Sequence, residues 1–212
     1  MDYIALETNL KKRVNNLPYT WGRKQNDLYD QRTKKIYKIR SYKELVQTFE
    51  KESNDIKHYA YNRWLNFWSA MAVESLFIKN KQGIEIKEAN KYNKTIDIYI
   101  KNIPFDHKTT IIPKSFIKDI SAIKTKENKI KLARWLYKNQ SKEGRQHFEN
   151  RIFVVLIDSK KPSESWKMKA EIQLIQHYIE KYLKNSKNKN IKPIVFNDNG
   201  HKFVTDIIYV IK

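Results

Sequence analysis

The sequence has no cysteine, so disulfide bonds, cysteine-ligated zinc and thiol catalysis are all excluded. Glycine occurs only four times in 212 residues, and neither a glycine-rich phosphate loop nor a dinucleotide-binding fingerprint is present. The five histidines are scattered, without zinc-ligand spacing. No apolar run approaches the ~20 residues that a membrane-spanning helix needs, and the N-terminus lacks the apolar segment of a secretory signal. We therefore expect a cytoplasmic protein that does not enter a membrane.

Positive charge is abundant instead. The chain has 43 Lys and Arg residues against 23 Asp and Glu, a formal net charge of +20. Such an excess favours binding to a polyanion, most simply a nucleic acid. Lysine, asparagine and isoleucine are all frequent, however, and an AT-rich genome enriches the same residues without any functional cause. The charge therefore favours a nucleic-acid partner and leaves a compositional explanation open.

Hydrophobic periodicity predicts an α/β order of elements. Helices are expected over residues 3–15, 41–52, 58–79, 128–140 and 165–183, and strands over 84–89, 151–158, 192–196 and 202–211. Residues 1–56 then form a helical, basic N-terminal region, and residues 57–212 form the domain that contains the sheet. The continuous apolar run 151–158 is typical of a central buried strand. The last two strands either extend that sheet or form a subdomain.

The segment of residues 95–110 is the most informative stretch of the chain. Isoleucine occupies every second position from 96 to 100, which is the pattern of a half-buried strand. Residues 102–104 are predicted to turn the chain into a returning strand over residues 105–110. The segment is thus expected to be a hairpin.

Three charged side chains are expected to converge on this hairpin. Asp106 and Lys108 are two residues apart, so they project from the same face of the strand, and the side chain of His107 projects from the other face. If the two strands pair, Asp97 reaches the first face from the neighbouring strand. Two carboxylates and an amine would then meet at one point.

These residue types suit metal-assisted cleavage of a phosphodiester. Mg²⁺ takes oxygen ligands, usually one or two carboxylates together with waters and phosphate oxygens. Asp97 and Asp106 provide carboxylates, and the backbone carbonyl of His107 is a further candidate ligand. The ion lowers the pKa of a bound water and neutralises charge on the phosphate. Lys108 would position or help to deprotonate that water and would stabilise the transition state.

The pattern of Asp97, a spacer of eight residues and then Asp106-His107-Lys108 resembles the PD-(D/E)xK, or restriction-endonuclease-like, nuclease superfamily. The resemblance covers roughly residues 62–158, and this chain departs from the pattern in having Ile96, not proline, before the first aspartate. It implies a central mixed β-sheet flanked by helices, Mg²⁺ as cofactor and Mn²⁺ as a substitute. It also implies that Glu74, on the helix before the sheet, is an auxiliary acid near the metal.

A small chain with one such domain is most similar to a Type II restriction endonuclease, which implies double-stranded DNA as substrate and a homodimer. Candidate DNA contacts are Arg23 and Lys24, in a basic segment dotted with aromatic residues, and Arg145. Solvent exposure without a DNA contact is the alternative for each of them. Arg151 enters the central strand, but the sequence leaves open at which end of the sheet it lies.

Three other functions remain open from the sequence. A repair, recombination or RNA nuclease would share the same metal chemistry. A nucleic-acid-binding protein without catalysis would use the hairpin only as scaffold. A protein-interaction module is consistent with lysine enrichment from composition alone. Divalent-metal binding and the kind of nucleic acid that is cut distinguish among these functions.

Overall fold

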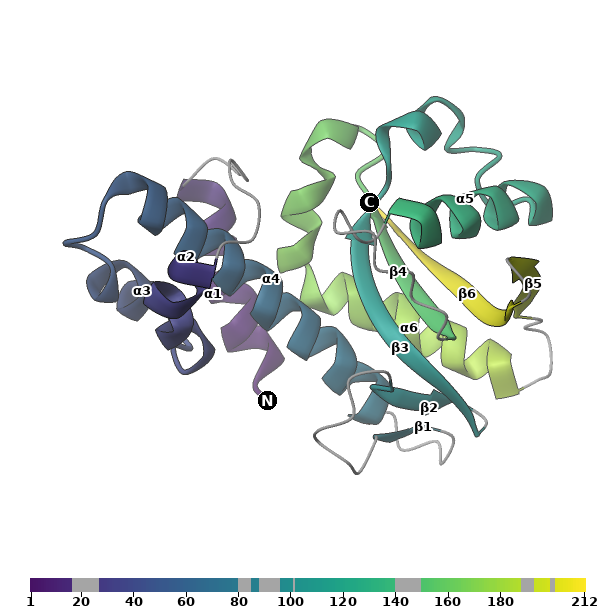
Figure 1. Cartoon of the computed structure of the whole chain (residues 1–212), viewed down its shortest axis with the longest axis horizontal. Coiled ribbons are helices and arrows are strands. Elements are labelled where there is room, and N and C mark those ends of the chain that lie inside the picture. Colours follow the sequence, from purple (N-terminus) through teal and green to yellow (C-terminus); the bar gives the residue numbers. More distant parts are fainter. Residues whose placement is uncertain are drawn as a thin grey trace.

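The structure is a computed structural model, and it describes residues 1–16, 27–79, 85–87, 96–100, 102–139, 150–187, 193–198 and 201–212. These residues form an α/β fold with a central mixed sheet, helices on both of its faces and a helical N-terminal region beside it (Figure 1). The fold class expected from the sequence is thereby confirmed. Within the same ranges, no helix is both long and apolar enough to cross a membrane.

The N-terminal region consists of helices that lie beside a long helix, the first of them along most of its length and the others near its N-terminal half. They are α1 (Tyr3–Asn16), α2 (Asp27–Thr33), the 3₁₀ helix η1 (Lys34–Tyr37) and α3 (Tyr42–Thr48). Ser41 caps α3, because its hydroxyl accepts a hydrogen bond of 3.2 Å from the backbone N–H of Glu44. The long helix α4 (Asn54–Lys79) then runs from these helices to the sheet (Figure 1).

One sheet contains all six strands that the described residues form. They are β1 (Glu85–Lys87), β2 (Ile98–Ile100), β3 (Ile103–Ile111), β4 (Arg151–Ile157), β5 (Ile194–Asp198) and β6 (His201–Ile211). Their order is β1-β2-β3-β4-β6-β5. The first three strands and the β5–β6 pair are antiparallel, whereas β3, β4 and β6 run parallel. The last two strands therefore extend the central sheet, which settles the alternative that the sequence left open.

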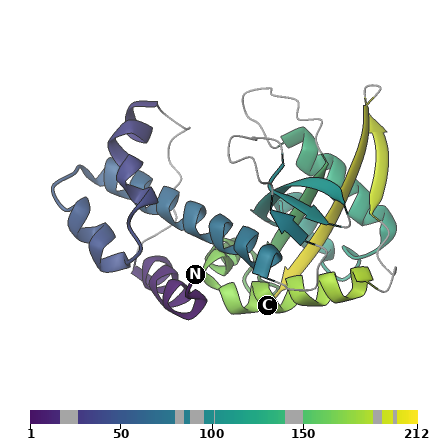
Figure 2. The same ribbon diagram turned by 90° about the horizontal axis from the view of Figure 1, so that it is seen from below.

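The helices divide over the two faces of the sheet. Helix α5 (Lys126–Asn139) packs on the face that carries Phe153, Val155 and Ile207. Helices α4 and α6 (Ile172–Lys187) cover the other face, which carries Ile152, Val154 and Ile208. Figure 2 shows α6 along one side of the sheet. Strand β4 is buried along its whole length because helices cover both of its faces.

Several expected boundaries differ in the structure, and two of them have an identifiable cause. Ile103 already pairs with Ile100, so the hairpin turn is shorter than residues 102–104, and Asn102 adopts a positive φ of 62°. Asparagine tolerates this conformation better than most residues, which permits the tight turn. The expected helix of residues 165–183 is divided into the 3₁₀ helix η3 (Pro162–Ala170) and α6, because Glu171 has a ψ of 62° and interrupts the helix.

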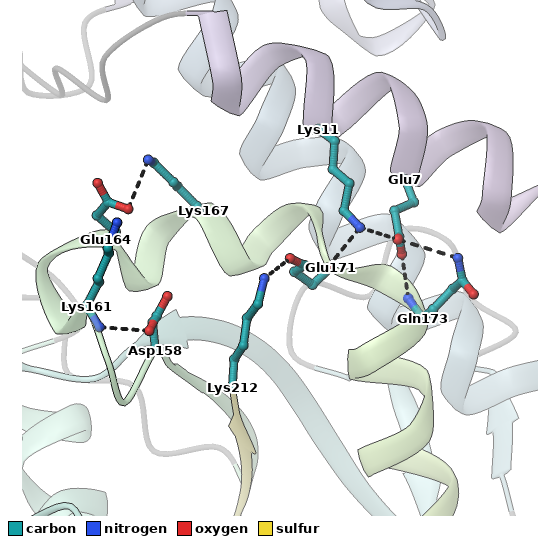
Figure 3. Close-up of polar contacts among 9 residues, drawn as sticks. All are labelled: Glu7, Lys11, Asp158, Lys161, Glu164, Lys167, Glu171, Gln173 and Lys212. Carbon is teal, nitrogen blue, oxygen red and sulfur yellow. Dashed lines mark hydrogen bonds and ion pairs between the residues drawn. The ribbon is translucent and has the colours of Figure 1, made fainter.

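The N-terminal helices share a hydrophobic core with the sheet. One cluster of buried residues extends from Leu10 in α1 through Trp64 in α4 to Val154 in β4. Polar contacts add to it, since the buried carboxylate of Glu7 accepts a hydrogen bond of 2.7 Å from the backbone N–H of Gln173 (Figure 3). The proposed boundary between residues 56 and 57 falls in the first turns of α4, and the division at that point stays a prediction.

Candidate active site

Asp106 lies where β3 begins to pair with β4. Its backbone N–H donates a 2.9 Å hydrogen bond to the carbonyl of Asn150, and its register partner is Arg151. The residue is only 4% exposed, whereas the Lys108 side chain is 48% exposed. Lys108 Nζ lies 2.8 Å from Asp106 Oδ1. The expected common face of these two side chains is confirmed.

Arg151 is the partner that the sequence did not assign to the site. Its Nε lies 2.9 Å from Asp106 Oδ2, and the residue is 3% exposed. Its guanidinium lies 5.7 Å from the centre of the Tyr137 ring. The parallel pairing of β3 with β4 puts the first residue of β4 opposite Asp106. The sequence shows a basic residue at the start of an apolar run. Whether that residue lies at the same end of the sheet as Asp106 depends on how the strands pair, which the sequence alone does not show.

Asp97 directly precedes β2 and contacts the backbone of β3. Its Oδ2 accepts a 2.9 Å hydrogen bond from the His107 N–H, and its own N–H donates to the Phe105 carbonyl at 3.0 Å. Burial raises the pKa of Asp97, and the negative charge of Asp106 raises it further. The His107 hydrogen bond and the Lys108 ammonium lower it. The charges of the two carboxylates therefore interact, and the meeting of both with the Lys108 amine at one point stays a prediction.

The side chain of His107 faces α4, on the side of the sheet opposite Asp106. Its Nε2 lies 2.8 Å from the Thr109 hydroxyl, and its ring centre is 6.0 Å from that of Phe77. Burial lowers the pKa of this imidazole to about 4, so the ring is neutral at pH 7. Because the Asp106 N–H points toward β4, the peptide groups of His107 point toward the β2 side. The backbone of His107 thus faces Asp97 while its side chain packs away from the site.

Glu74 is half-buried on α4. Among the residues that the structure describes, no three His, Asp or Glu side chains form a group that could hold a metal ion. Glu74 therefore does not join Asp97 and Asp106 in such a group. The candidate ligands that the structure brings together are these two carboxylates and the backbone of His107.

A cavity of about 510 Å³ opens beside Asp106, between β3, β4 and α5. Both cationic partners of Asp106 line the cavity, namely Lys108 and Arg151. Leu136 and Phe153 give the cavity apolar walls, and Trp135 and Lys114 also line it. Trp135 is 38% exposed. The cavity lies on the same face of the sheet as the Asp106 and Lys108 side chains.

The expected nucleic-acid contacts Arg23, Lys24 and Arg145 lie outside the described residues. Their proposed roles stay predictions.

No protein-family model matches the chain, and no curated protein or solved structure matches it either.

Proposed function

We propose that this chain is a metal-dependent nuclease that hydrolyses phosphodiester bonds in double-stranded DNA, similar in its chemistry to a Type II restriction endonuclease. One observation carries the proposal. Asp97, just before β2 begins, contacts β3 next to Asp106 and Lys108, where β3 begins to pair with β4. A mixed sheet flanked by helices is also what the resemblance to the PD-(D/E)xK superfamily implies.

The donor set suits a hard divalent cation. Mg²⁺ binds through one or two carboxylates, with waters and substrate phosphate oxygens completing its coordination. Asp97 and Asp106 would hold it, together with the His107 carbonyl. Burial and the neighbouring Asp106 charge raise the pKa of Asp97, and a cation between two such carboxylates would relieve their repulsion. When bound, Mg²⁺ or Mn²⁺ supplies an acidified water and neutralises charge on the phosphate.

Each protein group has a separate task in this proposal. The Lys108 ammonium, half-exposed beside Asp106, orients the attacking water and donates to the phosphate oxygen that gains charge. Arg151 fixes the orientation of the Asp106 carboxylate through its Oδ2 atom. The His107 N–H fixes the orientation of Asp97. Glu74 does not join the two carboxylates in the structure, so the proposal gives it no task.

A nucleic-acid-binding protein without catalysis is the second candidate, and one observation favours it. Both oxygens of Asp106 already have cationic partners, Lys108 and Arg151. A carboxylate satisfied in this way has less to gain from a metal ion. Calorimetric titration with Mn²⁺ separates the two functions. The nuclease binds Mn²⁺ and Asp97→Asn weakens that binding at least tenfold, whereas the scaffold shows no such site.

Cleavage of long, unmethylated plasmid and phage DNA tests the nuclease directly. We expect discrete products with Mg²⁺ and none with EDTA. Lys108→Ala should lower the rate by about 10²–10³-fold, because it removes one transition-state donor from an exposed position. Asp106→Asn should abolish cleavage but also disturbs the buried pair with Arg151. Lys108→Ala is therefore the cleaner variant.

Lys160→Ala is the matched control for Lys108→Ala, because it removes the same charge from an exposed position in the turn after β4. Both its cleavage rate and its DNA binding should equal those of the wild type. Equal cleavage rates for Lys108→Ala and Lys160→Ala would show that Lys108 takes no part in the reaction. Absence of cleavage of DNA and RNA by the wild type with Mg²⁺ and Mn²⁺ would overturn the nuclease proposal.

A further inference from the structure

The cavity beside Asp106 combines cations with apolar surface. Lys108 and Arg151 lie where it meets the candidate site, and Lys114 is an exposed cation elsewhere in its lining. Leu136 and Phe153 are both buried and give it an apolar lining. A concave site with apolar walls and a few charged groups is typical of small-ligand binding, and about 510 Å³ lies within the usual range of such sites.

Trp135 gives this cavity an aromatic surface. It is one of the few large apolar side chains among the described residues that remain exposed, at 38%. The Phe116 ring packs edge-on against it, with ring centres 6.3 Å apart and an interplanar angle of 76°. This edge contact supports the indole. A flat aromatic group that lines a cavity is suited to stacking with a planar ligand.

A nucleotide with its base unstacked matches these features. Its base is a planar group for the Trp135 ring, and its phosphate is an anion for Lys108. A base within a duplex cannot enter a concave site between a sheet and a helix, because its neighbours in the stack and its paired base prevent it. An unpaired base can enter, at the cost of losing its stacking.

We propose that this cavity binds one unstacked nucleotide of the strand to be cut, with its base against Trp135 and its phosphate next to Lys108. The proposal rests on the proposed nuclease function, because it places that nucleotide beside Asp106. The preferred substrate then has an unpaired or readily unpaired base near the scissile bond. Within double-stranded DNA, a site whose bases unpair readily satisfies this requirement better than a uniform helix.

Binding in EDTA tests the cavity without cleavage. The probes are a fluorescently labelled short oligothymidylate and an abasic oligomer of the same length, which keeps the phosphates and lacks the bases. We expect the wild type to prefer the oligothymidylate by about tenfold, since stacking of one base supplies that much affinity. Trp135→Leu should remove most of the preference, because leucine keeps apolar bulk and loses the ring. Trp135→Phe should retain it.

The comparison of leucine with phenylalanine separates stacking from packing. If Trp135 only packs against Phe116, both variants keep the wild-type preference, and the proposal is overturned. A wild type without any preference for bases overturns it as well. If the wild type shows no base preference but cleaves DNA with Mg²⁺, the nucleotide-binding proposal fails and the nuclease proposal stands. A preference that depends on the Trp135 ring, without cleavage in any metal, would support the cavity and reject the nuclease.

Discussion

At the scale of single residues, the pair of Asp106 and Arg151 is the most consequential feature of the site. Both are almost fully buried, and Arg151 Nε lies 2.9 Å from Asp106 Oδ2. Removing the two charges from water costs several kcal/mol per ion, and the attraction between them must offset this cost. Lys108 contacts the same carboxylate from a half-exposed position. The two cations should therefore differ in how strongly they couple to Asp106.

Double-mutant cycles measured by urea unfolding test this difference. The cycle of Asp106→Asn with Arg151→Met should give a coupling energy of about 2–3 kcal/mol, because each single variant leaves a buried charge without its partner. The cycle of Asp106→Asn with Lys108→Met should give about 1 kcal/mol or less, since water screens the exposed ammonium. Equal coupling energies in the two cycles would contradict the assignment of Arg151 as the main partner.

The sequence predicted part of this arrangement and could not predict the rest. Alternation along a strand is enough to place Asp106 and Lys108 on one face and the His107 side chain on the other. Arg151 differs because it joins the site through parallel pairing of β3 with β4, which brings together residues 45 positions apart in the sequence, 106 and 151. Strand order and register of this kind depend on long-range packing, which local periodicity does not encode. Asp97 is intermediate, because it needs only the hairpin.

At the scale of elements, a buried carboxylate connects helices from opposite faces of the sheet. Asp206 in β6 is fully buried and accepts a 2.9 Å hydrogen bond from the Tyr182 hydroxyl of α6. Lys129 of α5 forms an ion pair with the other carboxylate oxygen. The backbone N–H of Ile207 donates to that same oxygen at 2.8 Å. Since α5 also lines the cavity, this contact helps to set the position of the cavity wall.

Asp206→Asn tests the role of this contact. The amide keeps an acceptor for Tyr182 but leaves the Lys129 ammonium, 23% exposed, without a counter-charge. We expect a loss of roughly 2–3 kcal/mol in the free energy of unfolding, measured with urea. Glu127→Gln, which removes an exposed charge paired with Lys131 within α5, is the control and should change stability little. Similar losses in the two variants would show that Asp206 contributes no more than a surface charge.

Element boundaries were harder to predict than element types. Helix α6 shows the reason, because apolar residues continue through the expected range of residues 165–183 although the helix is interrupted at Glu171. The carboxylate of Glu171 pairs with Lys11 at 2.9 Å and with Lys212 at 2.5 Å, both remote in sequence. These contacts occur where the helix is interrupted, and they cannot be predicted from helical periodicity.

At the scale of the whole molecule, Glu171 lies where three remote parts of the chain meet. Lys11 belongs to α1 and Lys212 is the last residue, directly after β6 (Figure 3). Lys11 also pairs with Glu7 at 2.6 Å, and Glu7 in turn accepts the backbone N–H of Gln173. The network joins the N-terminal helix to the layer that covers the sheet. It therefore supplements the shared hydrophobic core in holding the helical region against the sheet.

The pH dependence of stability tests this docking. Burial alone would raise the pKa of Glu171, but its ion pairs with Lys212 and Lys11 lower it below the ordinary value of 4.5. A lowered pKa in the folded state stabilises the protein above pH 4.5, and this contribution is lost as the pH falls through the folded value. Glu171→Gln should therefore cost about 1 kcal/mol at pH 7 and progressively less in acid, measured by urea unfolding. Glu164→Gln, at a surface pair with Lys167, should change little at either pH. A cost for Glu171→Gln that is the same at pH 7 and pH 3 would mean that packing, and not the charge network, holds α1 in place.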